Sequence, residues 1–414
     1  MRGVLFLAES FHPVLGGGEG HIRMLSRALV ASGIPSTVLT RRSDASWPAD
    51  ERLEGVRVLR VGPSGPSRRG KYLMAPPAFR MALREAGRHD VLVVRGTRVL
   101  GLPGLFAARA AGCAVVMQPE VNGELSGEVY TWGTALDRPL PRRFVRGATR
   151  LRNLLVRDAD AFVAMSRAIE SEMVAAGIPP EKVVYSPHGV DTDHFRPASA
   201  TERAGFRRRL GWPEDALIVI YTGRLLRGKG LETLLDAFAA VAPQAPAARL
   251  VLVGSGAGQA LSVEDALRAR VARDGLAERV VFTGRLEDVA PALRASDVFV
   301  FPSLFEALGI SLIEAAACGL PGVGSRTGGI VDVLGDGRAG VLVPPGDASA
   351  LADALRALLA DPVRRAALGA GARQTACERF DLRGSLERYR FLFRELAGRR
   401  GAAPLVTGSA APSR

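Results

Sequence analysis

Short apolar runs alternate with amphipathic segments along the first half of the chain. Val4–Ala8 is an apolar run of strand length, and Glu19–Ser32 places Ile22, Leu25 and Leu29 on one face at helical spacing. The same alternation continues toward the middle of the chain. We expect further strands at Thr37–Leu39, Val56–Val61, Val91–Val94, Ala114–Met117, Ala161–Ala164 and Val183–Tyr185, and a further helix at Ser166–Ala176. Strands that alternate with helices predict a parallel, doubly wound α/β sheet.

The second half of the chain repeats this pattern. We expect strands at Leu217–Thr222, Leu250–Val253, Val280–Thr283, Val298–Phe301, Gly322–Gly324 and Val341–Val343. We expect helices at Gly230–Val241, Val263–Asp274, Asp288–Ala295, Ser311–Cys318 and Ala348–Leu359. The repeat predicts a second doubly wound, Rossmann-like sheet.

Two such sheets in series predict two domains that face each other across a cleft. We expect one Rossmann-like domain over residues 1–195 and the other over residues 196–380. Residues 381–400 are expected to form a helix that packs back on the first domain. Residues 401–414, rich in Ala, Gly, Ser and Pro, are expected to form a disordered tail. Because ligands of doubly wound sheets bind outside the carboxyl ends of the strands, the chemistry is expected in the loops there.

Composition and charge argue against several classes of protein for this sequence. The net charge is +13, but almost all of the 55 basic residues are arginines, which favours a compositional habit over a binding surface. No basic run interleaved with aromatic residues and no zinc-finger spacing accompanies the charge, so nucleic acid is not an expected partner. No segment is apolar and long enough to span a membrane. The three cysteines lie far apart without metal-ligand spacing, which favours reduced thiols in a cytoplasmic protein.

Two glutamates frame the start of an expected helix. In the segment FPSLFEALGISLIEAAACGLPGVG, Glu306 lies in the loop after the strand at Val298–Phe301, and Glu314 lies in the first turns of the next helix. The backbone of Gly309, Ile310 and Ser311 forms the helix start, whose free N–H groups suit phosphate oxygens. One carboxylate can therefore bind sugar hydroxyls while the other binds a ribose. Two carboxylates alone would equally suit a solvated helix end.

This segment resembles the signature of the retaining glycosyltransferases of family 4, in which two glutamates are separated by seven residues. The family has the two-domain, B-type glycosyltransferase fold. The resemblance implies that Glu306 contacts the sugar of a nucleotide diphosphate sugar and that Glu314 contacts its ribose. Within such a fold, residues 1–195 form the acceptor side and residues 196–380 bind the donor.

Two further segments resemble motifs of the same family. The run YTGRLLRGKGLETLLDAF supplies Arg224 and Lys229, which we expect to bind the diphosphate leaving group and to act in catalysis together with Glu306. The glycine-rich turn GGGEGH lies between the first strand and the first helix. It places Gly17 and Gly18 where a ligand can approach the backbone closely, with Glu19 beside them.

Weaker resemblances lie on neighbouring strand ends. Gly254 and Leu286 follow two expected strands where the family frames the nucleotide base, although plain turns would explain both segments equally well. Many family members carry a histidine after the strand that corresponds to Ala114–Met117, and here Gln118 and Glu120 stand in its place. We expect these two residues to position the sugar or the acceptor, since the leaving phosphate can accept the acceptor's proton. Glu124 is a further candidate, and the segment could also be an acceptor-side loop.

A basic segment lies in the first expected domain, between its glycine-rich turn and the motifs of the second expected domain. Residues 142–157 hold six arginines, with Phe144, Ala148, Leu151 and Leu155 between them at near-helical spacing. The spacing predicts an amphipathic helix. It could dock on an anionic membrane, at the inner face of the cell membrane, or pack on its own domain with solvated arginines.

The sequence therefore predicts a metal-independent, retaining transferase. It would move a hexosyl-type sugar from a UDP- or GDP-linked donor to a glycan, a lipid-linked acceptor or a small molecule. No cofactor and no metal are expected, because no Asp-x-Asp pair stands in a donor loop. The alternatives are a sugar-nucleotide epimerase of the same fold and a non-catalytic binding module. Their expected signs are groups for anti-elimination in the first case and the loss of Arg224, Lys229 or Glu314 in the second.

Overall fold

The computed structural model describes residues 1–399, apart from 15, 66–68, 129–141 and 260. The expected tail at 401–414 lies outside the described residues. The chain divides into two compact units. Unit 1 consists of Met1–Pro187 and Ser385–Arg414, and unit 2 consists of His188–Gly384. The chain thus crosses from one unit to the other twice.

Unit 1 is built on an eight-stranded sheet in the order β3-β4-β2-β1-β5-β6-β7-β8. Its strands are β1 (Val4–Leu7), β2 (Ser36–Arg41), β3 (Asp50–Leu53), β4 (Val56–Val61), β5 (Val91–Arg95), β6 (Ala114–Gln118), β7 (Ala161–Ala164) and β8 (Val183–Tyr185). Its helices are α1 (Gly17–Ala31), α2 (Gly70–Leu73), α3 (Ala75–Ala86), α4 (Gly101–Ala111), α5 (Arg142–Val156) and α6 (Arg167–Ala175). Helix α15 (Leu382–Gly398) returns to this unit from the end of the chain.

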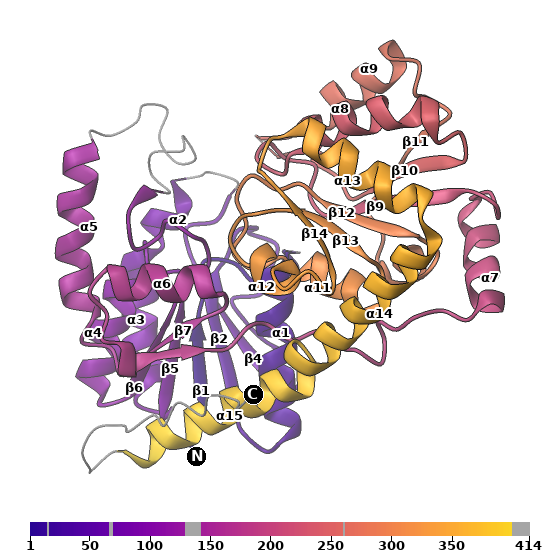
Figure 1. Ribbon diagram of the computed structural model, residues 1–414. Coiled ribbons are helices and arrows are strands. Elements are labelled where there is room, and N and C mark those ends of the chain that lie inside the picture. Colours follow the sequence, from indigo (N-terminus) through magenta and orange to yellow (C-terminus); the bar gives the residue numbers. More distant parts are fainter. Residues whose placement is uncertain (15, 66–68, 129–141, 260, 400–414) are drawn as a thin grey trace. The chain divides into compact units, whose positions relative to one another are not determined.

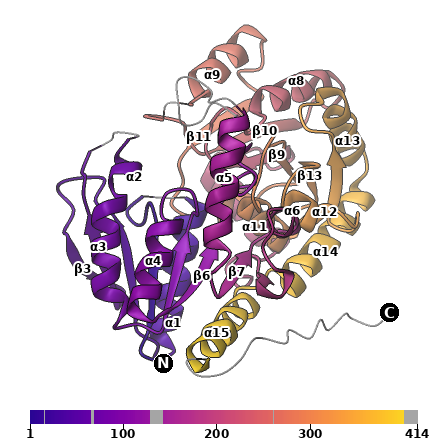
Figure 2. The same ribbon diagram turned by 90° about the vertical axis from the view of Figure 1, so that its left-hand side faces the viewer.

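Helices cover both faces of the sheet in unit 1. The central strands β1 and β5 are buried along their whole length, because a parallel sheet with two covered faces needs apolar residues at every position. One face packs against α1 and α15, which supply Leu25, Tyr389 and Phe393 to a single apolar cluster. The other face carries α3 and α4, which lie side by side in Figure 2. Helix α15 therefore belongs to the core of unit 1.

Unit 2 is built on a six-stranded sheet in the order β11-β10-β9-β12-β13-β14, and every strand pair in it is parallel. Its strands are β9 (Leu217–Thr222), β10 (Ala248–Val253), β11 (Val280–Gly284), β12 (Val298–Phe301), β13 (Gly322–Ser325) and β14 (Gly340–Val343). Its helices are α7 (Ala200–Leu210), α8 (Leu231–Val241), α9 (Glu264–Arg273), α10 (Ala290–Arg294), α11 (Ile310–Ala317), α12 (Ile330–Leu334), α13 (Ala348–Ala360) and α14 (Pro362–Arg379).

The sheet of unit 2 is also covered on both faces. Helices α8 and α13 pack together on one side, and α11, α12 and α14 pack together on the other (Figure 1). Strand order reverses beside β9, which pairs with β10 on one edge and with β12 on the other. In a doubly wound sheet the loops that follow these strands meet at such a point and form the ligand site.

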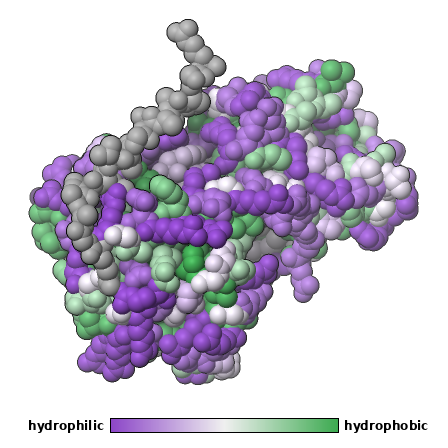
Figure 3. Space-filling model, turned by 90° about the horizontal axis from the view of Figure 1, so that it is seen from below, coloured by the Kyte–Doolittle hydropathy of each residue, from purple (hydrophilic) through white to green (hydrophobic). Residues whose placement is uncertain are grey.

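The predicted fold class is confirmed, since both halves are doubly wound α/β sheets. One strand departs from the expected parallel pairing: β3 pairs antiparallel with β4 at the edge of the sheet. Its sequence DERL has no apolar run to signal a strand, because an edge strand needs only one partner and is largely exposed. Among the described residues, no helix is both long and apolar enough to cross a membrane. Hydrophilic residues cover most of the face shown in Figure 3, with apolar residues in small patches.

Candidate functional site

The loops at the carboxyl edge of the sheet in unit 2 approach one another backbone to backbone. A Cβ built on Gly254 would lie 1.8 Å from the carbonyl oxygen of Gly223, and one built on Gly230 would lie 1.9 Å from the carbonyl oxygen of Pro302. Both glycines also adopt positive φ, so no other residue fits without moving the backbone. The loops after β9, β10 and β12 are therefore held close together by glycines that the motif spacing places there.

Lys229 and Glu306 form an ion pair across two of these loops. The ammonium of Lys229, from the loop after β9, donates to Oε2 of Glu306, from the loop after β12, at 2.8 Å. The lysine Nζ also lies 5.7 Å from the ring centroid of Phe301, within cation–π range. Both side chains are mostly buried, with 23% and 14% exposed. Two of the predicted catalytic residues thus meet, although 77 residues separate them in sequence.

Arg224 lies in the same loop and is differently placed. Its carbonyl accepts a hydrogen bond from the buried hydroxyl of Tyr221 at 3.1 Å, which fixes the backbone at that point. Burial raises the pKa of the Tyr221 phenol, so it remains a donor. The guanidinium of Arg224 is exposed, and within the described chain it makes no hydrogen bond or ion pair. A fixed backbone with an open cationic head group suits the binding of an anion.

Helix α11 begins at this edge of the sheet. Its N-cap is Gly309 at φ +90°, no side chain caps it, and its first turn holds no acidic residue. A Cβ on Gly309 would lie 3.1 Å from the ring of Phe301, which explains why glycine stands there. The N–H groups of Ile310 and Ser311 come first in the helix, where the dipole favours an anion. The helix start can therefore accept phosphate oxygens.

Glu314 lies on the next turn of α11 and is partly buried. Burial, together with the nearby carboxylate of Asp288, raises the pKa of Glu314 to about 8. At neutral pH the side chain is therefore mostly protonated, and it can both donate and accept a hydrogen bond. Such a group suits the paired hydroxyls of a ribose. The sequence indicated the position of Glu314 but not its protonation.

The remaining predicted residues of unit 2 lie at the same edge. The amide of Gly254 donates to the carbonyl of Gly284 at 2.8 Å, which joins the ends of β10 and β11. Leu286 follows in the next loop and is half-buried. The structure thus brings together the nine predicted donor residues of unit 2, namely Arg224, Lys229, Gly254, Leu286, Glu306, Gly309, Ile310, Ser311 and Glu314.

Unit 1 carries the other predicted residues, at the start of α1 and after β6. Helix α1 begins at Gly17 behind the extended N-cap Gly16, and Glu19 accepts a hydrogen bond from the hydroxyl of Ser10 at 2.5 Å. A Cβ on Gly18 would lie 3.1 Å from the guanidinium of Arg95 and 3.5 Å from a carboxylate oxygen of Glu120. The glycine-rich turn therefore lies directly against the end of β5 and the loop after β6.

Sequence reasoning missed Arg95 as a residue of this cluster. It is almost fully buried, donates to Glu120 at 3.0 Å and lies 3.2 Å from the ring nitrogen Nδ1 of His21. Burial and Arg95 lower the pKa of His21 well below its usual value, so the ring is neutral. Burial raises the pKa of Glu120, while Arg95 opposes that change. An arginine at the end of the apolar run VLVV was the available signal.

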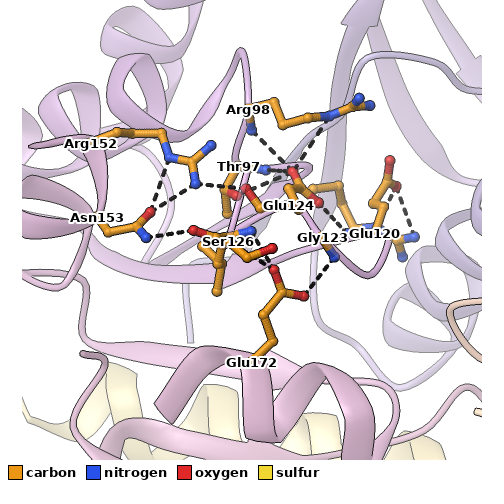
Figure 4. Close-up of polar contacts among 11 residues, drawn as sticks. Thr97, Arg98, Glu120, Gly123, Glu124, Ser126, Arg152, Asn153 and Glu172 are labelled. Carbon is orange, nitrogen blue, oxygen red and sulfur yellow. Dashed lines mark hydrogen bonds and ion pairs between the residues drawn. The ribbon is translucent and has the colours of Figure 1, made fainter. Parts of the chain in front are cut away.

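Gln118 and Glu124, two candidates for the missing histidine's role, are engaged in structural contacts. The buried amide of Gln118 donates to the hydroxyl of Tyr389 on α15 at 2.9 Å. Glu124 is fully buried and accepts hydrogen bonds from the backbone N–H groups of Thr97, Arg98 and Glu120 at 2.5, 3.1 and 2.8 Å (Figure 4). Of the candidates after β6, Glu120 is therefore the one whose side chain remains partly open, with 35% exposed.

Glu172 completes the support of the loop after β6. Its carboxylate accepts from the backbone N–H groups of Gly123, Leu125 and Ser126, at 2.7 to 2.8 Å (Figure 4). Because each buried N–H needs a partner, these bonds replace those that a helix or strand would supply. The loop that carries Glu120 is therefore firmly held without regular secondary structure.

Glu9, at the end of β1, is a second residue that the sequence did not indicate. Its Oε1 is buried and accepts no hydrogen bond from any residue that the structure describes. Burial raises the pKa of Glu9, against the charges of Arg98 and Lys71. No group of three or more His, Cys, Asp or Glu that could hold a metal ion occurs in the described part of the chain.

The pKa of Glu314 predicts how stability depends on pH. The folded state holds its proton up to about pH 8, whereas the unfolded chain releases it near the ordinary value of 4.5. Between these values the unfolded state binds fewer protons, so this group lowers stability as pH rises. When thermal unfolding is measured between pH 5 and pH 8, the Tm of Glu314→Gln should fall less than the Tm of the wild type. The exposed Glu278→Gln serves as the control. Equal slopes for Glu314→Gln and the wild type would contradict the assigned burial.

Comparisons with known proteins agree with this architecture. The family model described as "Glycosyl transferase 4-like domain" matches residues 16–189, and the one described as "Glycosyl transferases group 1" matches residues 216–361. The D-inositol 3-phosphate glycosyltransferase of Xylanimonas cellulosilytica is 33% identical over 381 residues, which cover 88% of each chain. The GDP-mannose-dependent alpha-(1-6)-phosphatidylinositol monomannoside mannosyltransferase of Mycolicibacterium smegmatis is 31% identical over 96% of this chain and 99% of its own.

A solved structure gives the same picture. The sucrose-phosphate synthase of Thermosynechococcus elongatus superimposes with a TM-score of 0.81 at 26% identity, over 96% of this chain and all of that one. The motifs that led to the predicted site thus lie in a chain whose two halves match the two domains of one enzyme family. The chain belongs to the group 1 glycosyltransferases, the retaining family 4 with the B-type fold, and transfers a sugar from a nucleotide sugar donor.

Proposed function

We propose that unit 2 binds the donor by its diphosphate and its two sugars. Arg224, Lys229 and the start of α11 would hold the diphosphate, Glu306 the transferred sugar and Glu314 the ribose. The observation that carries this proposal is the ion pair between Lys229 and Glu306, which brings a phosphate-binding cation and a sugar-binding carboxylate to one point at the sheet edge. The exposed guanidinium of Arg224 supports it.

The chemistry that follows is the stabilisation of a leaving group. When the bond between the sugar and the diphosphate breaks, negative charge develops on the leaving phosphate. Lys229 and Arg224 neutralise that charge, and the N–H groups of Ile310 and Ser311 donate to it. The phosphate then accepts the proton of the acceptor hydroxyl, which attacks from the same face. No metal ion is needed in this scheme, because the side chains and helix start supply the positive charge.

We propose that the acceptor is a polyol or sugar that carries a phosphate. Its support is that the relatives' names include D-inositol 3-phosphate, a phosphatidylinositol mannoside and sucrose phosphate. In unit 1, Glu9, Glu19 and Glu120 would accept hydrogen bonds from acceptor hydroxyls, and Gly17 and Gly18 would contact the donor. UDP- or GDP-linked hexoses are the proposed donors. The three cysteines form no disulfide in the described part of the chain, which supports a cytoplasmic protein.

Removing either cation should slow transfer without unfolding the protein. Loss of one charged donor to a developing anion typically costs about 10²–10³-fold in turnover. Arg224→Ala and Lys229→Ala should each show a loss of that size in assays of released nucleoside diphosphate. Arg227→Ala, an exposed arginine three positions after Arg224, is the matched control and should retain turnover. Wild-type rates in either test variant, with the fold intact by circular dichroism, would contradict the proposed role.

The acceptor can be identified with a panel of paired compounds. UDP-glucose, UDP-N-acetylglucosamine and GDP-mannose are each incubated with inositol 3-phosphate, inositol, fructose 6-phosphate and fructose, and products are detected by mass spectrometry. We expect one donor to yield a glycosylated product, with the phosphorylated member of a pair favoured at least about tenfold, the factor that 1.4 kcal/mol of binding energy gives. Equal rates for both members would refute the phosphate requirement. An isomerised donor without transfer would refute the transferase mechanism itself.

A further inference from the structure

Helix α5 turns its more apolar stripe away from the unit that it belongs to. The stripe consists of Phe144, Leu151, Leu154 and Leu155, whose exposed fractions are 62%, 62%, 52% and 40%. Phe144, Leu151 and Leu155 share one face of the helix, since they are spaced by seven and four residues, and Leu154 lies beside them three residues after Leu151. The buried face is formed instead by Val145, Thr149, Asn153 and Val156. An ordinary surface helix has the reverse arrangement, with its apolar stripe facing the core.

Specific contacts fix this orientation of α5. Asn153 donates to the carbonyl of Leu125 at 2.8 Å, and Arg152 donates to the carbonyl of Glu124 at 2.8 Å (Figure 4). A Cβ on Gly127 would lie 2.8 Å from the hydroxyl of Thr149, so the loop after β6 packs closely on the helix. Rotating α5 about its axis to bury the stripe would break all of these contacts. These contacts therefore hold the apolar stripe of α5 in its outward orientation.

The stripe is flanked by cations. Helix α5 contains five arginines and no acidic residue. Arg143, Arg146 and Arg150 are exposed, and within the described ranges none of them forms an ion pair or a hydrogen bond. Elsewhere in unit 1 arginines are commonly paired, as Arg109 is with Asp158 and Asp160. Unpaired arginines beside exposed leucines combine the two features of an interfacial amphipathic helix.

A second apolar feature lies close to α5. Helix α4 contacts both α3 and α5, and the three helices lie next to one another in Figure 2. Between α3 and α4 is a shallow hollow of about 350 Å³, lined only by the apolar residues Ala75, Pro76, Phe79, Leu102, Pro103 and Phe106. Phe106 is 51% exposed, and Leu73, just before α3, is 61% exposed. The apolar surface thus continues beyond α5 across neighbouring helices.

We propose that unit 1 docks on an anionic lipid surface through the exposed stripe and arginines of α5, with the hollow between α3 and α4 as a further apolar contact. The positive charge of α5 favours an anionic bilayer over a second copy of the chain as the partner of this surface. A second copy bound symmetrically would place Arg143, Arg146 and Arg150 near the same three arginines of that copy, which opposes association. In an anionic bilayer, Phe144 and Leu151 would insert into the apolar interior, and the flanking arginines would contact the negatively charged headgroups. One apolar contact or one charge cluster alone gives only weak binding, whereas the two together give stable attachment.

The test is flotation of the full chain with lipid vesicles. One set of vesicles holds phosphatidylcholine alone, and the other holds phosphatidylcholine with phosphatidylserine. We expect the protein to float with the anionic vesicles only. Arg143→Gln/Arg146→Gln/Arg150→Gln should weaken binding by about tenfold or more, given the contribution of each cation near an anionic surface. Leu151→Ser/Leu154→Ser should weaken it as well, because the arginines alone bind reversibly.

Matched controls distinguish this surface from a general effect of exposed arginines or exposed apolar side chains on vesicle binding. Arg209→Gln/Arg364→Gln/Arg394→Gln removes the same number of exposed charges from α7, α14 and α15, and Phe391→Ser removes a side chain that is 68% exposed on α15. Both should float like the wild type. The proposal is overturned if the chain ignores anionic vesicles, or if the α5 variants bind as well as the controls. It is also overturned if sedimentation shows a dimer that the α5 variants dissociate while vesicle binding is absent.

Discussion

The ion pair between Lys229 and Glu306 joins the two loops on which the proposed chemistry of unit 2 depends. It exists because strand order reverses beside β9, so that the loops after β9 and β12 leave the sheet at neighbouring points. Gly230 lets those two loops approach to backbone contact, and Gly254 does the same for the loops after β9 and β10. A side chain at position 230 would push the loop after β9 away from Pro302. The geometry of the sheet, the glycines and the charge pair therefore form one arrangement, and α11 adds its N-terminus to it.

Two sets of carboxylates in this protein differ in their partners. Glu124 and Glu172 are saturated by backbone N–H groups and hold the loop after β6 in shape. Desolvation raises the pKa values of Glu9, Glu120 and Glu314, and at Glu120 the charge of Arg95 opposes that change. Groups of the second set are the ones that a ligand's hydroxyls can satisfy. Carboxyl groups with raised pKa values are accordingly better candidates for binding a ligand than fully bonded ones.

Sequence patterns predicted the fold well, and they placed the proposed donor residues at one edge of a sheet. Apolar runs identified all six strands of unit 2, because strands covered on both faces must be apolar throughout. They missed β3, whose residues are polar and exposed. Motif spacing placed Glu306 and Lys229 at one sheet edge, but their contact depends on strand order, which periodicity does not encode. Arg95 and Glu9 were missed because their surroundings come from distant loops. The stripe of α5 was visible in sequence, but which face is buried depends on Thr149 and Asn153 meeting the loop after β6.

A crystal structure of the chain with a bound nucleoside diphosphate tests the central claim most directly. We expect a phosphate oxygen within hydrogen-bond distance of Lys229 and of the first N–H groups of α11, the guanidinium of Arg224 turned toward the diphosphate, and the ribose hydroxyls on Glu314. A nucleotide bound at another edge of the sheet, with Lys229 and Glu306 still paired and apart from it, would contradict the account.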